Sequence, residues 1–380
     1  MAGRDAVSRW MVRSAMTTAA VGLAAGGIGF IGTGAAAAAH ERRCTSNVGG
    51  TGLSAAVVAR SHQKIANRAI NAKGCDIGMF VGKSASHVTI DSVVVSGARF
   101  QGILAQKTSH LTIEHSTITD NGFKTTNKAA PPQPGSGVKS FVSQAFAISL
   151  FGVSQSTVAD NSVFNNGRGG IGVMDNGPND PGALKQNRSA PLVSSSHDRI
   201  LNNSTWKNYN GCGIVLATQN LGGRLSHLVV SGNTVIGMGR SKTNGPDIGG
   251  VVVAADPPNS SVRNVRVSAN TVAGSFEGGV IVNAEAFNSS TKNVHVTGNT
   301  VSGNNWGRQE APKTAGIIVF ANPAAQGPPH TNAPVNMGAV VAGNTATDQF
   351  YGIWSAGKFR PKVTQNHIQV TAGGTRIART

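Results

Sequence analysis

The sequence predicts an all-β solenoid, a parallel β-helix in which short strands wind into stacked coils. Two observations lead to this prediction. A phrase made of an alternating strand, a turn and a second strand recurs along the chain, and a small residue then opens an apolar, β-branched strand. Within this repeat there is no 3.6-residue periodicity of the kind that marks an amphipathic helix. Because one unit cannot bury its own apolar side, the units must stack to form a continuous core.

Composition narrows the classes of protein. The 380 residues include 33 Lys and Arg against 16 Asp and Glu, which gives a net charge of +17. Charged residues make up only 13% of the chain, too few for a coiled coil. The basic excess comes from scarce acids rather than from dense basic tracts, so we expect no nucleic-acid partner.

The N-terminus has the pattern of a secretory signal peptide. Arg4, Arg9 and Arg13 precede an uncharged stretch that ends in the alanine run 35–39. We expect residues 1–39 to be removed on export, which would make the mature protein extracytoplasmic. An uncleaved anchor is the alternative, because the apolar part is long enough to span a bilayer. No later stretch is apolar enough to do so, and we expect no membrane association after cleavage.

Residues 40–73 should form an N-terminal cap. Within them, Gly52–Ala72 contains helix formers with apolar residues at Val57, Ile65 and Ile70. This pattern predicts an amphipathic helix that covers the open end of the core, which a parallel stack needs for solubility.

Three cysteines allow one disulfide. Export permits disulfides, and Cys44 and Cys75 flank the first folded segment, so this pair is a candidate. Cys212 would then be a small buried residue. The other two-cysteine pairings remain open.

Residues 74–370 should form about nine coils, and residues 371–380 a polar tail that frays. The turn positions between the first two strands are Val93, Ser116, Asn161, Asn203, Asn233, Asn270, Asn299, Asn344 and Asn366. The third strands begin at Gly78, Gly102, Ala147, Gly170, Gly213, Gly250, Gly279, Gly316 and Gly352. Asn tolerates the left-handed backbone conformation of a tight turn, and stacked side-chain amides can hydrogen-bond along the axis. We therefore assign the Asn column to structure.

These repeats resemble the right-handed parallel β-helix superfamily of pectate-lyase-like proteins and periplasmic β-helix repeat proteins. The resemblance covers about Gly74 to Val370 and depends on the phrase x-V-x-[VI]-x-x-N-T-V followed by G-[IV]-x-V. It implies a right-handed, single-stranded helix whose Gly-led sheet floors a polysaccharide cleft. The superfamily includes lyases, polygalacturonase-like hydrolases, mannuronan epimerases, tailspikes and an accessory protein for copper delivery. The chain lacks the Asp-Asp, Gly-His-Gly and Arg-Ile-Lys signatures of the hydrolases, so the resemblance assigns no single reaction.

A candidate site lies at the ends of the Gly-led strands. Extra chain length on both sides of these strands should form two walls of a groove. Six residues after each leading Gly comes a polar column: Asn176, Gln219, Asp256, Glu285 and Asn322. Asp256 and Glu285 lie on neighbouring coils with backbones about 4.8 Å apart, a spacing that suits acid–base catalysis or a Ca²⁺ site. Asp175 sits one position earlier and joins the catalytic candidates if its strand ends early. The alternative is solvated residues without chemistry.

The predicted walls carry cations and aromatic residues that suit an anionic glycan. The candidates for substrate binding are Arg168, Arg240, Trp306 and Arg308, together with the amides of the polar column. Dispersed, solvated charges are the alternative. A repeated His column should stabilise turns, although neighbouring imidazoles are also ligands for Cu or Zn. Its members are His87, His110, His197 and His227.

We therefore expect a secreted, monomeric protein that binds an extracellular, anionic polysaccharide and processes it as a lyase, hydrolase or epimerase. The alternative is a non-catalytic envelope β-helix that binds glycan or protein, or an accessory protein of a periplasmic metalloenzyme.

Overall fold

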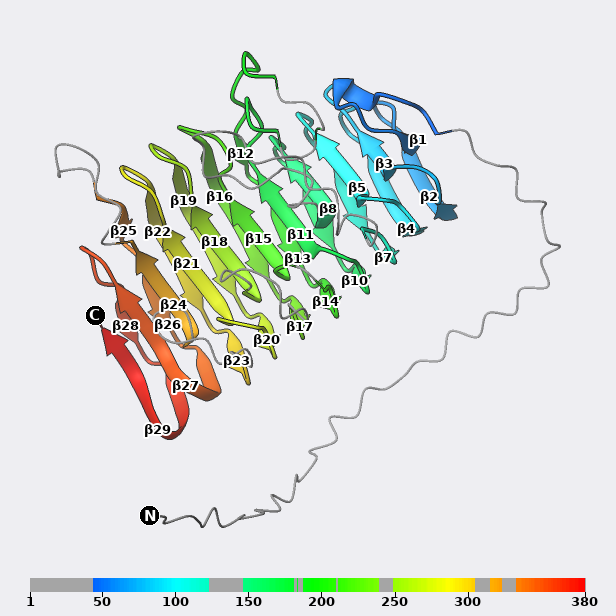
Figure 1. Ribbon diagram of the computed structural model, residues 1–380. Coiled ribbons are helices and arrows are strands. Elements are labelled where there is room, and N and C mark those ends of the chain that lie inside the picture. Colours follow the sequence, from blue (N-terminus) through cyan, green and yellow to red (C-terminus); the bar gives the residue numbers. More distant parts are fainter. Residues whose placement is uncertain are drawn as a thin grey trace, which may run out of the picture. The chain divides into compact units, whose positions relative to one another are not determined.

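The computed structural model describes residues 44–122, 146–180, 183, 187–209, 211–238, 249–304, 315–322 and 333–379. The described strands pair in parallel from coil to coil, and together they form one 29-stranded solenoid (Figure 1). The fold is the predicted right-handed β-helix. The segment 1–39, predicted to be a signal peptide, lies outside the described residues.

Each full coil contributes strands to three faces. We call the face built from the Gly-led strands the Gly-led sheet. Its strands are β1 (Ala55–Val58), β3 (Ile77–Val81), β5 (Gln101–Gln106), β8 (Phe146–Phe151), β11 (Gly169–Met174), β15 (Ile214–Ala217), β18 (Val251–Ala255), β21 (Val280–Ala284), β24 (Ala315–Ala321) and the ends of β27 (Thr345–Ala356) and β29 (His367–Arg379).

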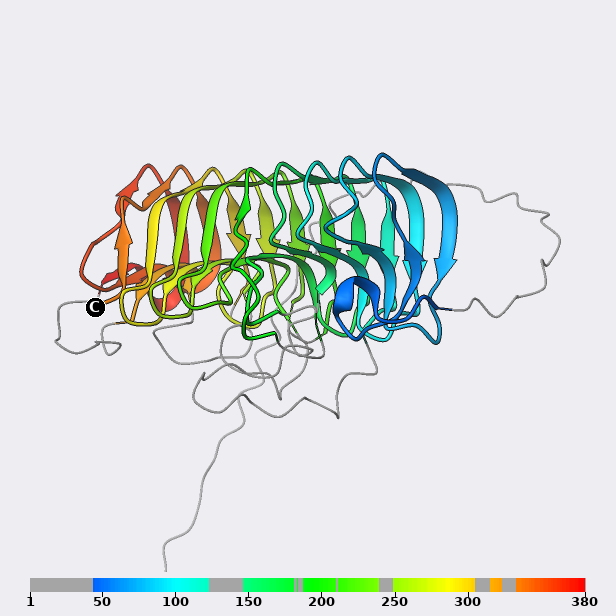
Figure 2. The ribbon, with the colours of Figure 1, turned by 90° about the horizontal axis from the view of Figure 1, so that it is seen from above.

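The second sheet precedes the Asn turn. Its strands are β2 (Lys64–Asn71), β4 (Thr89–Ser96), β6 (Thr112–Glu114), β9 (Thr157–Ala159), β12 (Ser195–Ser196), β13 (Arg199–Leu201), β16 (Arg224–Ser231), β19 (Ser261–Ser268), β22 (Ser290–Thr297), β25 (Val335–Met337), β26 (Val340–Ala342) and β28 (Lys362–Thr364). The third sheet follows the turn. It contains the last residues of β2 and β4, which continue through the turn, and then β7 (Thr117–Thr119), β10 (Ser162–Phe164), β14 (Ser204–Trp206), β17 (Thr234–Ile236), β20 (Thr271–Ala273), β23 (Thr300–Ser302) and the beginnings of β27 and β29. Figure 2 shows the coils stacked along one axis.

The helix predicted over Gly52–Ala72 is wrong. This stretch forms β1 and β2, which pair with β3 and β4 and so make an additional first coil. The burial along β2 explains the misleading pattern: Ile65 and Ile70 are its two buried residues, five positions apart, and most of the residues between them are exposed. The described helical segment nearby is a single 3-10 turn, Val48–Gly50.

The C-terminal tail predicted for 371–380 is also wrong for the described residues. Positions 371–379 belong to β29, whose Thr375 and Ile377 pair with Tyr351 and Ile353 of β27. The Gly-led sheet therefore has one strand before and one strand after the nine that were predicted. All nine predicted leading positions lie in this sheet or directly precede its strands.

A small residue opens each Gly-led strand because the neighbouring coil leaves no room there. A Cβ atom on Gly250 would lie 2.1 Å from the Val272 side chain and 2.7 Å from the carbonyl oxygen of Gly279. Beyond this point the inward residues fill the interior: Val251, Val253 and Ala255 are completely buried in the main core cluster. The core is thus a continuous column rather than a set of separate pockets.

The predicted Asn column forms a hydrogen-bonded ladder. From Asn161 to Asn366 each Nδ2 donates to the Oδ1 of the Asn in the next coil, at 2.9–3.0 Å. The left-handed conformation, however, belongs to the preceding residue, for example Asn202 (φ 52°) and Ala269 (φ 53°). The Asn side chains thus bridge the coils, and the residue before each Asn makes the turn.

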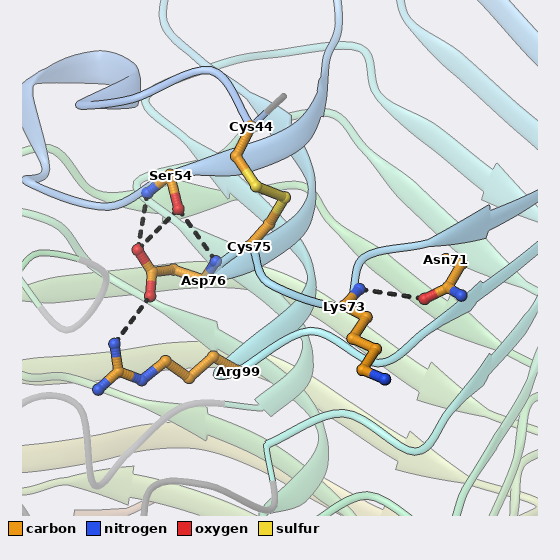
Figure 3. The surroundings of a disulfide bond; sticks show 7 residues. All are labelled: Cys44, Ser54, Asn71, Lys73, Cys75, Asp76 and Arg99. Carbon is orange, nitrogen blue, oxygen red and sulfur yellow. Dashed lines mark hydrogen bonds and ion pairs between the residues drawn. A yellow bond between two sulfur atoms is a disulfide. The ribbon is translucent and has the colours of Figure 1, made fainter. Parts of the chain in front are cut away.

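The Cys44–Cys75 disulfide forms, with Cα atoms 5.6 Å apart (Figure 3). Cys212 is buried and takes no part in a disulfide. Beside the disulfide, Asp76 Oδ2 accepts hydrogen bonds from the backbone N–H and hydroxyl of Ser54, both at 2.9 Å. Arg99 lies 3.6 Å from the other oxygen of Asp76. These contacts connect the starts of the first three Gly-led strands.

Candidate functional site

The polar column lies in register at the ends of the Gly-led strands. Ala255 pairs with Ala284, so the next residues, Asp256 and Glu285, are neighbours on adjacent coils. The Glu285 N–H donates to the Ala255 carbonyl at 3.1 Å, and the Asn322 N–H donates to the Ala284 carbonyl at 3.0 Å. The backbone spacing expected for Asp256, Glu285 and Asn322 is therefore present.

Neighbouring polar side chains contact the Glu285 carboxylate and the Asp256 backbone. Asn283 Nδ2 donates to Glu285 Oε1 at 2.7 Å, and Thr218 Oγ1 accepts the backbone N–H of Asp256 at 3.2 Å. Asn283 is two residues before Glu285 and therefore points to the same side of the strand. Asn283 was not among the predicted site residues, although the two-residue period of a strand would have indicated it. Asp256 and Glu285 are both half-buried.

Asp175 does not reach this surface. Its strand ends at Met174, but the carboxylate is fully buried, and it accepts hydrogen bonds from the Gln219 N–H at 2.5 Å and from Asn220 Nδ2 at 2.7 Å. Burial raises the pKa of Asp175 to about 6, against the lowering effect of these hydrogen bonds. Asp175 therefore holds the chain at 219–220 in place.

The amides nearest Asp175 are inaccessible as well. Gln219 is 5% exposed, and Asn176 is fully buried. The backbone N–H of Asn176 donates a hydrogen bond to the Val193 carbonyl, and the Asn176 carbonyl accepts one from the Val193 N–H. The described part of the column thus divides in two. Asn176 and Gln219 belong to the interior, and Asp256, Glu285 and Asn322 remain partly open to solvent.

The outer face of the Gly-led sheet is apolar and buried over much of its length. Coil-to-coil register aligns one row that includes Phe80, Leu104, Val215, Val252, Ile281, Ile318 and Trp354. None of these side chains is more than 6% exposed. A ligand at this sheet would therefore meet its end, where the carboxylates lie, rather than its centre.

The structure does not bring all the predicted substrate-binding residues of the walls close to Asp256 and Glu285. Arg168 directly precedes β11 and so lies at the opposite end of the Gly-led sheet, a strand length of about 20 Å away. Burial lowers the pKa of its guanidinium. Arg240, Trp306 and Arg308 lie outside the described residues.

The His column stabilises turns, as expected. Its residues have left-handed backbones, and the rings of neighbouring coils stack face to face. The ring centroids of His87 and His110 are 4.3 Å apart, and those of His197 and His227 are 4.6 Å apart. His62, which the sequence analysis missed, extends the column. Among the described residues, the group of His, Asp and Glu compatible with a metal ion is elsewhere, at Asp91, Glu114 and His115.

Two buried carboxyl groups, those of Asp198 and Glu277, were also missed. Asp198 is 1% exposed and points into the core, where its Oδ1 accepts the Ser156 N–H at 3.0 Å. Desolvation by burial raises its pKa to about 8.

The sequence matches the family described as "Right handed beta helix region" over residues 54–267, more than half of the chain. The chain belongs to this right-handed β-helix family. No curated protein matches the sequence. Within the described residues, no helix is long and apolar enough to cross a bilayer.

Several solved β-helix structures are similar in fold. The A-module of the mannuronan C-5 epimerase AlgE6 from Azotobacter vinelandii is 16% identical, with a TM-score of 0.51 over 86% of this chain and 76% of that one. The periplasmic alginate epimerase AlgG is 11% identical, with a TM-score of 0.50 over 82% and 61%. An exopolygalacturonase from Thermotoga maritima is 10% identical, with a TM-score of 0.48 over 80% and 55%. At these identities the two epimerase structures show a shared β-helix fold and nothing more specific.

Proposed function

We propose that this protein processes an extracellular, anionic polysaccharide, and that Asp256 and Glu285 act as its acid–base pair. The observation that carries the proposal is their register. Two half-buried carboxylates follow consecutive Gly-led strands, and one of them is oriented by Asn283. The solved structures with this fold include epimerases and a polygalacturonase, so the fold supports such chemistry without specifying it.

Asp256 and Glu285 could supply the general acid and the general base that glycosidic bond cleavage needs. In hydrolysis, the protonated carboxyl group donates its proton to the glycosidic oxygen as the bond to the anomeric carbon breaks. The other carboxylate takes a proton from the water that attacks this carbon, so that the two groups together gain and lose one proton. In β-elimination from a uronate, the base instead removes the proton next to the carboxyl group, and the acid protonates the leaving oxygen.

Export remains part of the proposal. The Cys44–Cys75 disulfide supports it, because structural disulfides persist in oxidising compartments. We also propose that the protein works as a monomer.

The decisive experiment measures turnover on a panel of uronate-rich and neutral polysaccharides. Reducing ends report hydrolysis, and absorbance of unsaturated uronate reports elimination. Asp256→Asn and Glu285→Gln should each abolish turnover in protein that unfolds at the wild-type temperature. Asp348→Asn removes an exposed carboxylate from a distant turn and should leave turnover unchanged. Full activity in both site variants on a responsive glycan would exclude this assignment. Repeating the assay with added Ca²⁺ and with a chelator tests whether the carboxylates also hold a cation.

A non-catalytic β-helix that binds glycan or protein is the second candidate. The buried apolar outer face of the Gly-led sheet favours it, because that face offers no polar floor in the row from Val215 to Trp354. In that case Asp256→Asn and Glu285→Gln would leave binding intact, and no glycan of the panel would be cleaved.

A further inference from the structure

A block of cations on the second sheet is separate from the carboxylate site. The sequences Arg263-Asn-Val-Arg266 and Lys292-Asn-Val-His295 occupy the same positions of consecutive coils. In the ladder of β19 and β22, Arg263 pairs with Lys292, and Arg266 pairs with His295. Figure 1 shows β16, β19 and β22 side by side. The block thus forms two short basic rows that run along the solenoid axis.

These cations have no counter-ions within the described chain. The ion pairs there involve Lys64, Arg99 and His115, all in the N-terminal coils. Arg263, Arg266 and Lys292 are exposed and make no ion pair with any described residue. Like charges at paired positions of neighbouring strands are destabilising by themselves. An anion bound between them would remove this repulsion.

The acids of these coils face elsewhere. Between Arg224 and Asn304, the described acids are Asp256 and Glu285, which follow β18 and β21, and Glu277, which precedes β21 and is fully buried. Neither the second sheet nor its turns carries an Asp or Glu in this range. The field over this part of the second sheet is therefore positive over several coils.

A hollow open to solvent lies over β16, β19 and β22, beside the row of Arg266 and His295. His227, Val229, Asn264, Arg266, Asn293, His295 and Thr297 are among the residues that line it. Hydrogen bonds hold its polar groups in place: Asn293 Nδ2 donates to Asn264 Oδ1 at 2.9 Å, and His295 Nε2 and Asn293 Oδ1 are 2.8 Å apart. Asn264 Nδ2 and His227 Nε2 are 3.0 Å apart. The site is built on strands and is therefore rigid before any ligand arrives.

We propose that this hollow binds the anionic group of an acidic polysaccharide whose chain lies along the solenoid axis. Arg266 and His295 line the hollow, and Arg263 and Lys292 pair three residues earlier on the same two strands, so that Arg263 and Lys292 present cations about 4.8 Å apart on successive coils. Arg, Asn, His and Thr side chains suit carboxylate or sulfate groups together with sugar hydroxyls. The described residues that line the hollow include no Phe, Tyr or Trp on which the bases of a single-stranded nucleic acid would stack.

The choice of a polysaccharide rests on the proposed function, but the surface is a different one. A polymer bound in this hollow would stay attached to the protein while its ends or other segments bind and dissociate at Asp256 and Glu285. The hollow is therefore a retention site and not the place of reaction. Binding and turnover can be measured separately, so the two proposals can fail separately.

The test is binding of the full chain to oligogalacturonate and to sulfated dextran, with neutral dextran as the reference. Arg266→Gln/Lys292→Gln should raise the Kd for the acidic polymers about tenfold or more and weaken its salt dependence. The matched control, Arg68→Gln/Lys83→Gln, removes two exposed cations from the first coils and should leave Kd within about twofold. Asp256→Asn/Glu285→Gln should keep the wild-type Kd.

Each other outcome overturns the proposal. An equal loss in the matched control would mean that net charge alone decides binding. Equal affinity for neutral dextran would mean that the cations are not used. If a single-stranded oligonucleotide bound in a way that Arg266→Gln/Lys292→Gln abolished, while neither acidic glycan bound, the ligand class would be wrong. Loss of turnover in Asp256→Asn with unaltered binding in Arg266→Gln/Lys292→Gln would overturn this site and leave the proposed function standing.

Discussion

Asp198 occupies the inward position that Leu228 takes on the next coil. The pairing of Arg199 with Val229 sets this register, and the Val229 N–H donates to the Asp198 carbonyl at 3.0 Å. A carboxyl group therefore stands in the apolar column of the core, beside a leucine.

This position predicts that stability falls as the pH rises. Because burial raises the pKa of Asp198 from 3.8 to about 8, the folded protein holds a proton that the unfolded chain releases between these values. The favourable contribution is complete below about pH 4 and is lost as the pH rises through about 8. Asp198→Asn should remove this pH dependence and stabilise the protein at pH 9 by about 1 kcal/mol or more.

Thermal unfolding at pH 5 and pH 9 measures the effect. Asp348→Asn is the control, because Asp348 is exposed. If Asp198→Asn lost as much stability between the two pH values as the wild type does, the buried carboxyl group would not be the cause.

Asp175 should matter for stability rather than for chemistry. Asp175→Ala leaves the Gln219 N–H and Asn220 Nδ2 without their acceptor in a buried place, which should cost about 2–3 kcal/mol. Chemical denaturation measures the loss, and hydrogen exchange should rise at residues 219–223. A variant that keeps wild-type stability but loses turnover would return Asp175 to the catalytic candidates.

The Asn ladder predicts a graded response to substitution. Asn270→Ala removes the acceptor of the Asn233 N–H and Nδ2 and the donor to Val230 and Asn299, all in the buried interior. Unfolding free energy should fall by about 2–4 kcal/mol. Asn366 is only partly buried and ends the ladder, so Asn366→Ala should cost clearly less. Equal losses in urea titrations would show that the ladder contributes no more at its centre than at its end.

The disulfide should stabilise the first coils locally. Its cysteines are 31 residues apart, a loop for which chain entropy gives about 3–4 kcal/mol. In Cys44→Ser/Cys75→Ser, amide exchange should accelerate in β1 and β3 and stay unchanged in β21 and β24, because coils of a solenoid contact only their neighbours. Cys212→Ser is the matched control. Uniform acceleration along the whole chain would contradict a local role.

The repeated interior of the fold could be predicted because each position is constrained by a neighbour. No larger residue fits at the leading Gly, and few other side chains could make the hydrogen bonds of the turn Asn. Both residues therefore recur in the sequence. The ends of the solenoid lack one neighbour, and there the pattern weakens. β2 carries Lys64, Asn67 and Arg68 on exposed positions, a composition that also suits a helix. Pairing with β4 decides the outcome, because tertiary context overrides a weak local preference.

The candidate site was predictable only in part. Counting from the leading Gly places Asp256 and Glu285 together because strand register carries the count from coil to coil. The burial of Asp175 follows from the chain at 219–220, whose path no periodicity encodes. Asp198 could have been found by alignment of the repeats, since other coils have Leu111 or Leu228 at its place.

Because of the Asn ladder, the spacing of the coils does not depend on the length of the loops between them. The rungs of the ladder keep side-chain bonds of 2.9 Å whether 22 residues of chain join them, as between Asn344 and Asn366, or 45, as between Asn299 and Asn344. Loops at the corners can therefore grow or shrink by duplication or deletion without moving any side chain on the faces. Such a scaffold can acquire a new specificity by exchanging one corner segment while the groups that bind or react stay where they were.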